Sequence, residues 1–430
     1  MNYLEAVDYI HSLLKFGIRP GLSGMNALLR LLDNPHQKLK YIHVAGTNGK
    51  GSTSTAISNV LIEAGYRVGL YTSPYVSHFL ERVQFNGKPV AEDVFARNVQ
   101  RVKVAVEELQ KKGTDITEFE ALTAAAFLCF AELECQAVVL EVGLGGRLDA
   151  TNVISCSLVN VITSLSLDHT AILGDTLQQI AFEKCGTLKK GCKAVSAYGQ
   201  PEEALDVIKS TVESMQGELV FPSESDIKVV KSDLFGTQFT YGGTQYSITM
   251  PGAHQLKNMT CVIEVCEFLK VDFNITEDHI QKGIAKTILP ARVEVLSTSP
   301  LVVLDGGHNA DGAKAFYDAV EEEISEKDRV IVIAGMMADK DVETSLMPLM
   351  KKTDVFLAVT PQNPRAMKAT ELSAIAEKYS EEALAVDDVK EAVSKAFSML
   401  DSDSALLCVG SLYLAGEVRE YLIEYSRKFN

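Results

Sequence analysis

Short aliphatic runs alternate with segments of helical periodicity in the first part of the chain. Apolar side chains recur at helical spacing from Ala56 to Ala64, and an alanine-rich helical segment is expected at Glu118–Leu133. Strands are expected at four aliphatic runs, Tyr41–Val44, Arg67–Thr72, Ala137–Val142 and Leu158–Leu165. Strands that alternate with crossover helices are typical of a parallel sheet.

The same alternation restarts near residue 300. Further strands are expected at Leu301–Leu304, Val330–Ala334, Val355–Val359 and Ala405–Val409, with helices at Ala313–Ile324 and Leu372–Tyr379. This pattern predicts a smaller, doubly wound, Rossmann-like domain. Between the two parts, Leu219–Met250 has β-prone runs around a Gly-Gly pair, which predicts antiparallel hairpins attached to the first domain.

The border between the two parts carries no low-complexity linker. We place it near Leu289–Arg292, where Pro290 precedes the restart of the alternation. The predicted domains are therefore residues 1–290 and 291–430, in agreement with the two or three domains that 430 residues allow.

Charge and cysteine content narrow the class of protein. Asp and Glu number 57 against 41 Lys and Arg, a formal charge of −16, so a surface that binds nucleic acid is not expected. The eight cysteines form no C-x-x-C pair, which favours buried, reduced thiols. The N-terminus lacks a signal-peptide pattern, and the longest nearly apolar stretch, Ala121–Ala131, is shorter than the roughly 20 residues of a membrane helix. We expect a cytoplasmic protein without a membrane partner.

The strongest local motif lies between the first expected strand and the helix that follows it. It consists of Gly46, Thr47, Asn48, Gly49, Lys50, Gly51 and Ser52. Glycines allow backbone amides to converge on phosphate oxygens, and the lysine and the helix N-terminus add positive charge. The motif is a variant P-loop, because Val44 stands at the register of the usual first glycine and Gly51 replaces the usual Ser or Thr.

Two further features concern the chemistry around this loop. Glu141 ends an apolar strand run, and a carboxylate there is a natural magnesium ligand, although a strand-end glutamate that points to solvent is the alternative. The glycine-rich run from Gly143 to Gly146 does not predict a dinucleotide site. Leu148 stands where the last glycine is needed, and Asp149 follows too soon to bind the ribose.

The phosphate loop resembles that of the folylpolyglutamate synthase and dihydrofolate synthase family, relatives of the Mur amino-acid ligases. The resemblance continues in family order across nearly the whole chain, through Tyr71–Pro74, Glu141–Asn152, Asp168-His169, Glu183–Gly186, His254–Asn258, Pro290–Arg292, Asp305–Asn309 and Gly410–Tyr413. It implies an α/β fold with a P-loop-containing parallel-sheet ATPase domain and a smaller doubly wound, Rossmann-like C-terminal domain that handles glutamate.

The resemblance also implies roles for particular residues. Ser73, Glu141 and His169 would hold two Mg²⁺ ions that bridge the phosphates of ATP, and Lys184 would carry a carbamate. Asn258, Arg292 and Asp305 would bind ATP together with the phosphate loop, and Lys50, Lys184 and His308 would serve catalysis, the last near the incoming amino acid. The chain departs from the family pattern at Cys185, Ala291 and Gly307, each a change between small residues.

The activity implied is ATP-dependent addition of L-glutamate to the γ-carboxylate of folate or tetrahydrofolate through an acyl phosphate, which releases ADP and phosphate. A bifunctional enzyme that also joins dihydropteroate to glutamate stays open. The residues that read the pterin fall in loops around Ser23–Met25 and Ser73–Arg82, which do not decide between the two. The expected partners are folate and L-glutamate, and the expected state is a monomer.

Two rivals are less favoured. Only 45 residues precede Gly46, too few for the UDP-sugar domain of a peptidoglycan-precursor ligase, and such ligases usually have Thr in place of Gly51. A GTPase switch is the rival from another class. The guanine-reading Asn-Lys-x-Asp motif is absent from the sequence, and a second α/β domain has no place in a simple switch.

Overall fold

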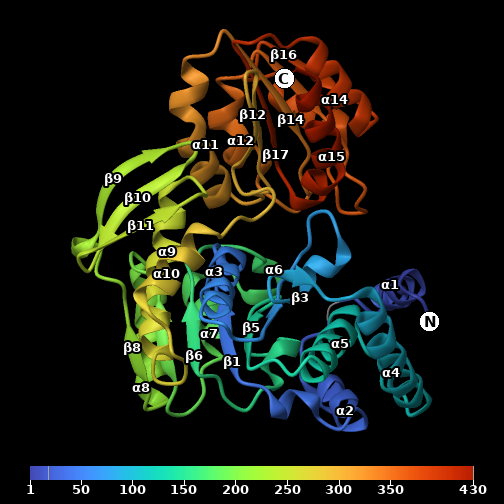
Figure 1. Ribbon diagram of the computed structural model, residues 1–430. Helices are drawn as coiled ribbons and strands as arrows, with labels where there is room; N and C mark the ends of the chain where they lie inside the picture. Colours follow the sequence, from blue (N-terminus) through green and yellow to red (C-terminus); the bar gives the residue numbers. More distant parts are fainter. Residues whose placement is uncertain (18, 430) are drawn as a thin grey trace.

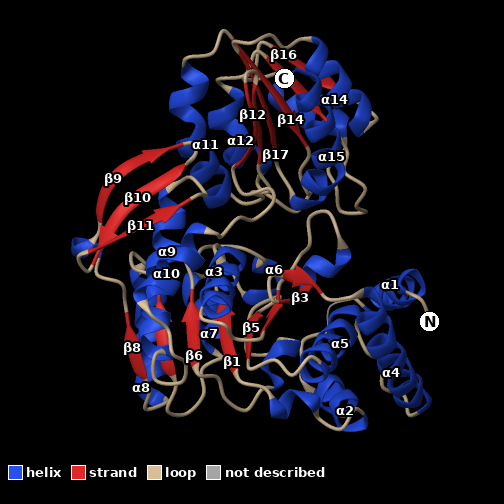
Figure 2. Ribbon diagram, viewed as in Figure 1, coloured by secondary structure: helices blue, strands red, loops and turns tan. Residues whose placement is uncertain are grey.

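A computed structural model describes residues 1–17 and 19–429 of the chain. It contains an eight-stranded sheet, a three-stranded sheet and a six-stranded sheet. Figure 1 shows the C-terminal domain stacked on the end of the N-terminal domain, with the three-stranded sheet running alongside both. Helices flank both large sheets (Figure 2), so the predicted α/β class with two parallel-sheet domains is confirmed.

The sheet of the N-terminal domain has the order β4-β3-β2-β5-β1-β6-β7-β8. Its strands are β1 (Tyr41–Ala45), β2 (Val68–Tyr71), β3 (Val83–Phe85), β4 (Lys88–Pro89), β5 (Ala137–Glu141), β6 (Val159–Ile162), β7 (Lys193–Ser196) and β8 (Glu218–Val220). Six neighbouring strands pair in parallel, in the order β2, β5, β1, β6, β7 and β8. The strands β3 and β4 extend the sheet beyond β2 as antiparallel strands. The first strand lies between β5 and β6, which places the phosphate loop at the middle of the sheet's carboxyl edge.

Alternate residues of the central strands enter different cores. Tyr41 and Val138 pack on one face with α1 (Tyr3–Ser12), α2 (Ser23–Leu31), α4 (Glu92–Lys111) and α5 (Glu118–Glu132). Ile42 and Val139 pack on the other face with α3 (Lys50–Glu63), α9 (Ala253–Leu269) and α10 (Glu277–Ala285). Both faces are therefore covered, which explains why these strands are continuous apolar runs. Three helices complete the domain: α6 (Thr170–Leu173), α7 (Leu177–Cys185) and α8 (Glu202–Ser214).

The small antiparallel sheet consists of β9 (Lys228–Asp233), β10 (Gly236–Tyr241) and β11 (Thr244–Ile248). It confirms the predicted hairpins, with one correction at their start. Leu219 belongs to β8, which pairs in parallel with β7 at the edge of the large sheet. Leu234, at the turn between β9 and β10, packs into a core of the C-terminal domain, so the small sheet contacts both domains.

The C-terminal sheet has the order β12-β13-β17-β14-β15-β16 and is parallel except for β12. Its strands are β12 (Glu294–Thr298), β13 (Leu301–Leu304), β14 (Arg329–Ala334), β15 (Val355–Ala358), β16 (Glu382–Ala385) and β17 (Ser404–Val409). Its helices are α11 (Ala310–Ser325), α12 (Val342–Met350), α13 (Ala369–Ala376), α14 (Val389–Ser398) and α15 (Leu412–Phe429). The predicted strands of this half are confirmed. Alternate residues of these strands again pack into two different cores.

The cysteines match the expectation of buried, reduced thiols with one exception. All eight cysteines are free, and all are buried except Cys156. Among the described residues, no helix combines the length and the apolar character needed to cross a bilayer.

Candidate active site

The phosphate loop connects the end of β1 to the start of α3 and is shaped by two glycines in the left-handed region. Gly46 has φ 150° and Gly49 has φ 88°. A Cβ atom at Gly46 would lie 1.8 Å from Thr163 Oγ1, and one at Gly49 would lie 2.2 Å from Asn258 Oδ1. Only glycine fits either place, because the backbone approaches a neighbouring segment too closely for a side chain. The buried Asn258 on α9, which was expected to bind ATP, therefore lies directly against the phosphate loop.

Lys50, the first residue of α3, folds back over the loop. Its ammonium group donates to the carbonyl oxygens of Gly46 at 3.1 Å and Thr47 at 3.0 Å. Burial lowers the pKa of Lys50, and the positive charge of Arg292 lowers it further, while Glu141 and Asp168 act in the opposite direction. The lysine is thus a compact cation at the N-terminus of a helix, where a phosphate group binds favourably.

Lys184 approaches the same loop from α7. Its side chain is 5% exposed, and its ammonium group donates a 2.7 Å hydrogen bond to the Gly46 carbonyl. Burial lowers the pKa of Lys184 to about 7, with a further contribution from the charge of Lys50. A lysine in this state has a large fraction of neutral amine at neutral pH, the form that reacts with carbon dioxide.

Glu141 ends β5 with its carboxylate buried rather than in solvent. The side chain is 3% exposed, and its Oε2 accepts a long 3.4 Å hydrogen bond from the backbone N–H of Ser73. Burial raises the pKa of Glu141 to about 7, although Lys50 and the Ser73 N–H act against this. Gly51 lies beside this carboxylate, since a Cβ there would be in ordinary van der Waals contact with Glu141 Oε2 at 3.7 Å.

Two of the three expected magnesium ligands are thus together, and the third is nearby on another loop. His169 has φ 51°, and its Nε2 lies 3.9 Å from Asp168 Oδ2. Among residues 1–17 and 19–429, no cluster of three or more His, Cys, Asp or Glu side chains is arranged to hold a metal. The chemistry of the donors still fits Mg²⁺, because the nearly unpartnered buried carboxylate of Glu141 beside Ser73 is a place where a hard cation is favoured. Imidazole is the less suitable member, since Mg²⁺ prefers oxygen.

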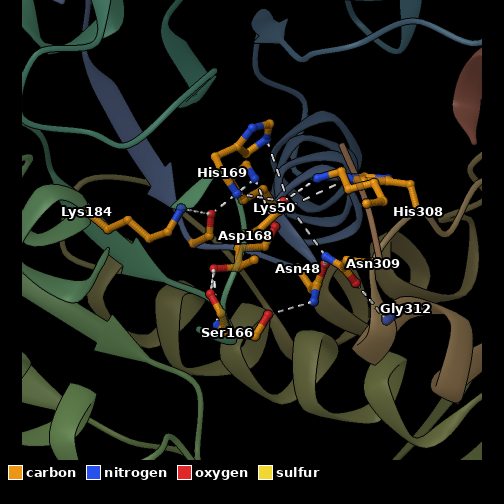
Figure 3. Close-up of polar contacts among 12 residues, drawn as sticks. Asn48, Lys50, Ser166, Asp168, His169, Lys184, His308, Asn309 and Gly312 are labelled. Carbon is orange, nitrogen blue, oxygen red and sulfur yellow. Dashed lines mark hydrogen bonds and ion pairs between the residues drawn. The ribbon is translucent and has the colours of Figure 1, made fainter. Parts of the chain in front are cut away.

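Asp168 joins the two domains and was not among the predicted site residues. Its carboxylate accepts from the ammonium group of Lys340. It also accepts from Asn309 Nδ2 at 3.4 Å, and His308 Nε2 lies 3.7 Å away (Figure 3). Burial opposes ionisation, but His308, His169 and Lys340 outweigh it and hold the pKa of Asp168 well below its usual range. The structure thus places His308 of the C-terminal domain against Asp168 of the N-terminal domain.

Asn309 makes a second connection across the same boundary. Its Nδ2 also donates to Asn48 Oδ1 at 3.1 Å, while its own Oδ1 caps α11 through the backbone N–H of Gly312. Asn48 in turn donates to Ser166 Oγ at 3.3 Å. The phosphate loop, the segment that leads to Asp168 and the start of α11 are linked in one polar network, drawn in Figure 3.

Arg292 lies in the connection between α10 and β12, between two residues of unusual conformation. Ala291 has φ 54° and Val293 has φ 46°, and a β-branched residue in the left-handed region is a genuine outlier. The buried carboxylate of Asp305 holds this segment, because its Oδ2 accepts from Val293 N at 2.9 Å and its Oδ1 accepts from Gly307 N at 2.6 Å. Burial raises the pKa of Asp305. In this structure Asp305 thus binds backbone amides and supports Arg292.

A second carboxylate supports the same segment from β12. Glu294 Oε2 accepts from the backbone N–H of Ala291 at 2.9 Å. The guanidinium group of Arg419 on α15 binds both oxygens of Glu294, at 2.6 to 3.1 Å. Backbone strain of this kind persists only where surrounding contacts enforce it, and it concentrates at functional sites.

The glycine-rich run after β5 has a packing role. A Cβ at Gly143 would lie 2.4 Å from Phe119 Cζ, and one at Gly146 would lie 2.8 Å from the carbonyl oxygens of Glu183 and Lys184. Asp149 Oδ2 accepts from Leu144 N at 2.9 Å, which closes the turn. The glycines thus allow this loop to pack closely against α5 and α7.

The two loops expected to read the pterin both contact the first turn of α5. Three consecutive backbone N–H groups at residues 76–78 donate to the Glu81 carboxylate at 2.8 to 3.1 Å. Arg82 pairs with Glu118 at 2.8 Å, with both side chains nearly buried, and its guanidinium group lies over the rings of Phe79 and Phe119. The start of α2 lies beside Glu120, since a Cβ at Gly24 would be 2.8 Å from its Oε1.

Comparisons with known proteins agree on one family. The model of the Mur ligase middle domain matches residues 44–266, and that of the Mur ligase glutamate ligase domain matches residues 291–412. The chain is 34% identical to folylpolyglutamate synthase of Lacticaseibacillus casei, over 98% of this chain and 99% of that one. It is 36% identical to dihydrofolate synthase/folylpolyglutamate synthase of Bacillus subtilis, with the same coverage.

Solved structures resemble the chain over nearly its whole length. Folylpolyglutamate synthase of Mycobacterium tuberculosis complexed with ADP superimposes with a TM-score of 0.87, at 26% identity over 98% of this chain and 99% of that one. Escherichia coli FolC in complex with DHPP and ADP gives a TM-score of 0.86, at 27% identity over 99% of both chains.

Proposed function

We propose that this chain, which belongs to the folylpolyglutamate synthase and dihydrofolate synthase family of the Mur ligase superfamily, is a ligase that uses ATP to join L-glutamate to folate. The observation that carries the proposal is the joining of the phosphate loop to the C-terminal domain through Asn48, Asn309 and Asp168. Condensation of a carboxylate with an amine requires that a phosphoryl donor and an amino acid meet. The two domains joined by these contacts would supply the two binding sides.

The reaction would begin at the phosphate loop. Lys50 and the N-terminus of α3 would hold the β- and γ-phosphates, and Arg292 would approach from the connection between the domains. The γ-phosphoryl group would pass to the γ-carboxylate of the folate, which gives an acyl phosphate and ADP. The amino group of glutamate would then attack the carbonyl carbon, and phosphate would leave. Positioning and charge neutralisation would provide the catalysis, without a serine or cysteine nucleophile.

Ser73, Glu141 and His169 are the residues that would hold magnesium. When bound, Mg²⁺ neutralises charge on the phosphate oxygens and so favours transfer. Without the ion, the Glu141 carboxyl group is buried with its pKa near 7. A divalent cation beside it would keep it ionised.

A carbamate on Lys184 is the next part of the proposal. The pKa of about 7 gives the amine that this modification needs, and the product is a carboxylate on a buried side chain beside Lys50. The modification would turn a repulsive pair of cations into an attractive pair. His308, whose Nε2 lies 3.7 Å from Asp168 Oδ2, would act near the incoming amino acid.

The domain division at residues 290 and 291 follows from the same proposal, with nucleotide chemistry in the first domain and the amino acid held by the second. The monomeric state and the cytoplasmic location expected from the sequence stay predictions.

A bifunctional enzyme remains the second candidate, because the relative from Bacillus subtilis carries both activities in its name whereas that from Lacticaseibacillus casei carries one. Phosphate release should be measured with ATP, Mg²⁺ and glutamate, and with either dihydropteroate or tetrahydrofolate monoglutamate. Turnover with tetrahydrofolate alone indicates an extension enzyme, and turnover with both indicates a bifunctional one. Turnover with neither would overturn the proposed function.

A further inference from the structure

Two polar side chains lie next to each other inside the large sheet, on strands that are otherwise apolar. His43 on β1 is fully buried, and Asn160 on the neighbouring strand β6 is 1% exposed. The two residues are register partners on parallel strands, so their side chains leave the same face of the sheet. The other residues of these strands are tyrosine, isoleucine, valine and alanine, so the polar pair needs a physical reason.

The neighbours of His43 determine where its proton lies. Thr151 Oγ1 donates to Asp149 Oδ1 at 2.6 Å, so this hydroxyl can only accept from His43 Nε2, which lies 2.9 Å away. Burial, together with the charge of Lys189, lowers the pKa of His43 to about 3, so the ring is neutral. A neutral ring with its proton on Nε2 has a lone pair on Nδ1 that needs a donor.

Three buried polar atoms at this place have no protein partner. Across residues 1–17 and 19–429, no group forms a hydrogen bond with His43 Nδ1 or with either polar atom of the Asn160 amide. Such atoms are costly to bury without a partner. We propose that a water molecule binds between His43 and Asn160, and that His43 is a positioning residue for the loop that follows β5. The water site goes beyond the proposed function, and only its effect on the rate rests on that function.

The pattern of donors and acceptors selects water over an ion. His43 Nδ1 needs a donor, whereas the Asn160 amide offers an N–H donor and a carbonyl acceptor. A buried water molecule can donate to the ring and also bond with the amide. A chloride ion has no proton to donate to Nδ1. A metal cation has no lone pair for the amide N–H, and the charge of Lys189, which already acts on His43, would repel it.

Asp149 connects His43 to the turn after β5. Its carboxylate accepts from the hydroxyl of Thr151 and from the backbone N–H groups of Thr151 and Leu144, both at 2.9 Å. Three donors of this kind match an ionised carboxylate. Because His43 donates to the Thr151 oxygen, the hydroxyl proton stays directed at Asp149. Loss of the His43 donor would free the hydroxyl to rotate and would weaken the closure of the turn.

The same turn holds the end of α7, which carries Lys184. Arg147 N donates to the Glu183 carbonyl at 2.7 Å. Gly146 packs so closely here that a Cβ would lie 2.8 Å from the Lys184 carbonyl oxygen. His43 is thus connected, through two side chains and one turn, to the backbone of the lysine that lies against the phosphate loop. A shift of this turn would move Lys184 without any change in the phosphate loop itself.

Two measurements test the water site without any activity. A crystal structure of the wild-type chain that shows ordered water should have one water molecule within about 2.7–3.2 Å of His43 Nδ1 and of a polar atom of Asn160. NMR spectra of the chain with isotope-labelled histidine should show His43 neutral, with its proton on Nε2, from pH about 5 to 8. The signal is assigned from its loss in His43→Gln. The lack of a water molecule there, or a proton on Nδ1, would overturn the proposal.

Two conservative variants separate the two nitrogen atoms of His43. The amide nitrogen of glutamine reaches the place of Nε2, whereas that of asparagine reaches only the place of Nδ1. His43→Gln keeps the donor to Thr151, so its kcat should stay within about twofold of the wild type. His43→Asn loses this donor, and its kcat should fall about 10-fold, with the KM values for ATP and glutamate changed less than about twofold. The control is His36→Gln, which changes another buried histidine of the same domain and should keep the wild-type kcat.

Thr151→Val shows whether His43 acts through Thr151. This variant should lower kcat by a factor similar to that of His43→Asn, and the double variant should lose little more, because both changes break the same connection. Equal losses in His43→Gln and His43→Asn, or multiplied losses in the double variant, would overturn the positioning role. Thermal unfolding of each variant shows whether a rate change reflects a loss of folded protein. If the wild type shows no glutamate-dependent turnover, the proposed function is wrong, and the crystal structure and the NMR spectra still decide on the water site.

Discussion

The Lys184 ammonium group donates a 2.7 Å hydrogen bond to the carbonyl of Gly46, so a buried lysine from α7 lies directly against the phosphate loop. Its pKa of about 7 makes the neutral amine abundant at physiological pH. We predict that activity falls when carbon dioxide is removed and returns on addition of bicarbonate. At a fixed concentration of dissolved carbon dioxide, reactivation should quicken as the pH rises through about 7, since only the neutral amine reacts.

Lys184→Arg provides the matched variant, because a guanidinium group keeps the positive charge but forms no carbamate. It should lose activity and gain nothing from bicarbonate. Phosphate release in degassed buffer, with and without bicarbonate, is the measurement. If the wild-type activity is insensitive to carbon dioxide and Lys184→Arg is active, the enzyme does not use a carbamate on Lys184.

The burial of Lys184 also predicts a pH-dependent stability. Between pH about 7 and 10.5 the unfolded chain holds this proton while the folded chain has released it. The free energy of unfolding therefore rises with pH across this window, and the cost of burying the charge is greatest below it. Lys184→Met should raise the melting temperature most near pH 7, and its advantage should shrink toward pH 10. A difference that does not vary with pH would contradict the lowered pKa.

Gly49 tests how closely Asn258 must approach the phosphate loop. Gly49 and Gly113 both have positive φ, 88° and 79°, but a Cβ would clash with Asn258 at the first and meet nothing within 4 Å at the second. Gly113→Ala should lose only the conformational cost, about 1–2 kcal/mol. Gly49→Ala should lose more stability in urea and should also bind ADP more weakly. Equal losses and equal ADP affinity in the two variants would show that this close approach is not needed.

Lys50 and Glu141, the charged groups at the phosphate loop, should be needed for activity but not for folding. Lys50→Met and Glu141→Gln keep the approximate size of each side chain and should each reduce ligation by at least about 100-fold, as for loss of a transition-state contact. Their circular dichroism spectra should match that of the wild type. Lys209→Met, which changes an exposed lysine of α8, serves as the control. Near-normal ligation by either site variant would refute the role of that residue.

Loss of the ion pair between Arg419 and Glu294 should raise the KM for ATP, although neither residue lies in the phosphate loop. Arg419→Met removes a bidentate partner from a carboxylate that also holds Ala291 next to Arg292, so we expect a loss of about 2 kcal/mol and a higher KM for ATP. Lys428→Met breaks an exposed pair with Glu424 on the same helix and should cost less than about 1 kcal/mol. If the KM for ATP is unchanged in Arg419→Met despite the lost stability, the support of Arg292 is structural only.

Periodicity predicted most of the fold because the strands that matter are buried on both faces. Glu141 could be placed at a strand end for the same reason, since a run such as residues 137–140 has no other polar member. The edge strand β8 was missed, because three residues of mixed exposure carry no period and their pairing with β7 is set by the tertiary structure. Leu219 was therefore assigned to the hairpins that follow it.

The site was harder to complete from sequence than the fold. A phosphate loop is local, so its residues are contiguous, but Asp168 and Lys340 lie 172 positions apart and meet only when the domains pack. Nothing in the sequence around Lys340 distinguishes it from other loop lysines. For Asp305 the sequence identified the residue but not the groups that its side chain binds. The motif marked it as important, and the structure shows its carboxylate bound to the backbone amides of Val293, which follows Arg292, and of Gly307.

The central claim is that the two domains joined at Asp168 form one ligase site for ATP, folate and glutamate. The most direct measurement is the mass of the pteridine product after incubation of the wild-type chain with tetrahydrofolate monoglutamate, ATP, Mg²⁺ and L-glutamate, with ADP counted in parallel. The account predicts a product heavier by one glutamyl residue for each ADP formed, and no product with Lys50→Met. ADP formation without a heavier pteridine, or an equal yield from Lys50→Met, would contradict it.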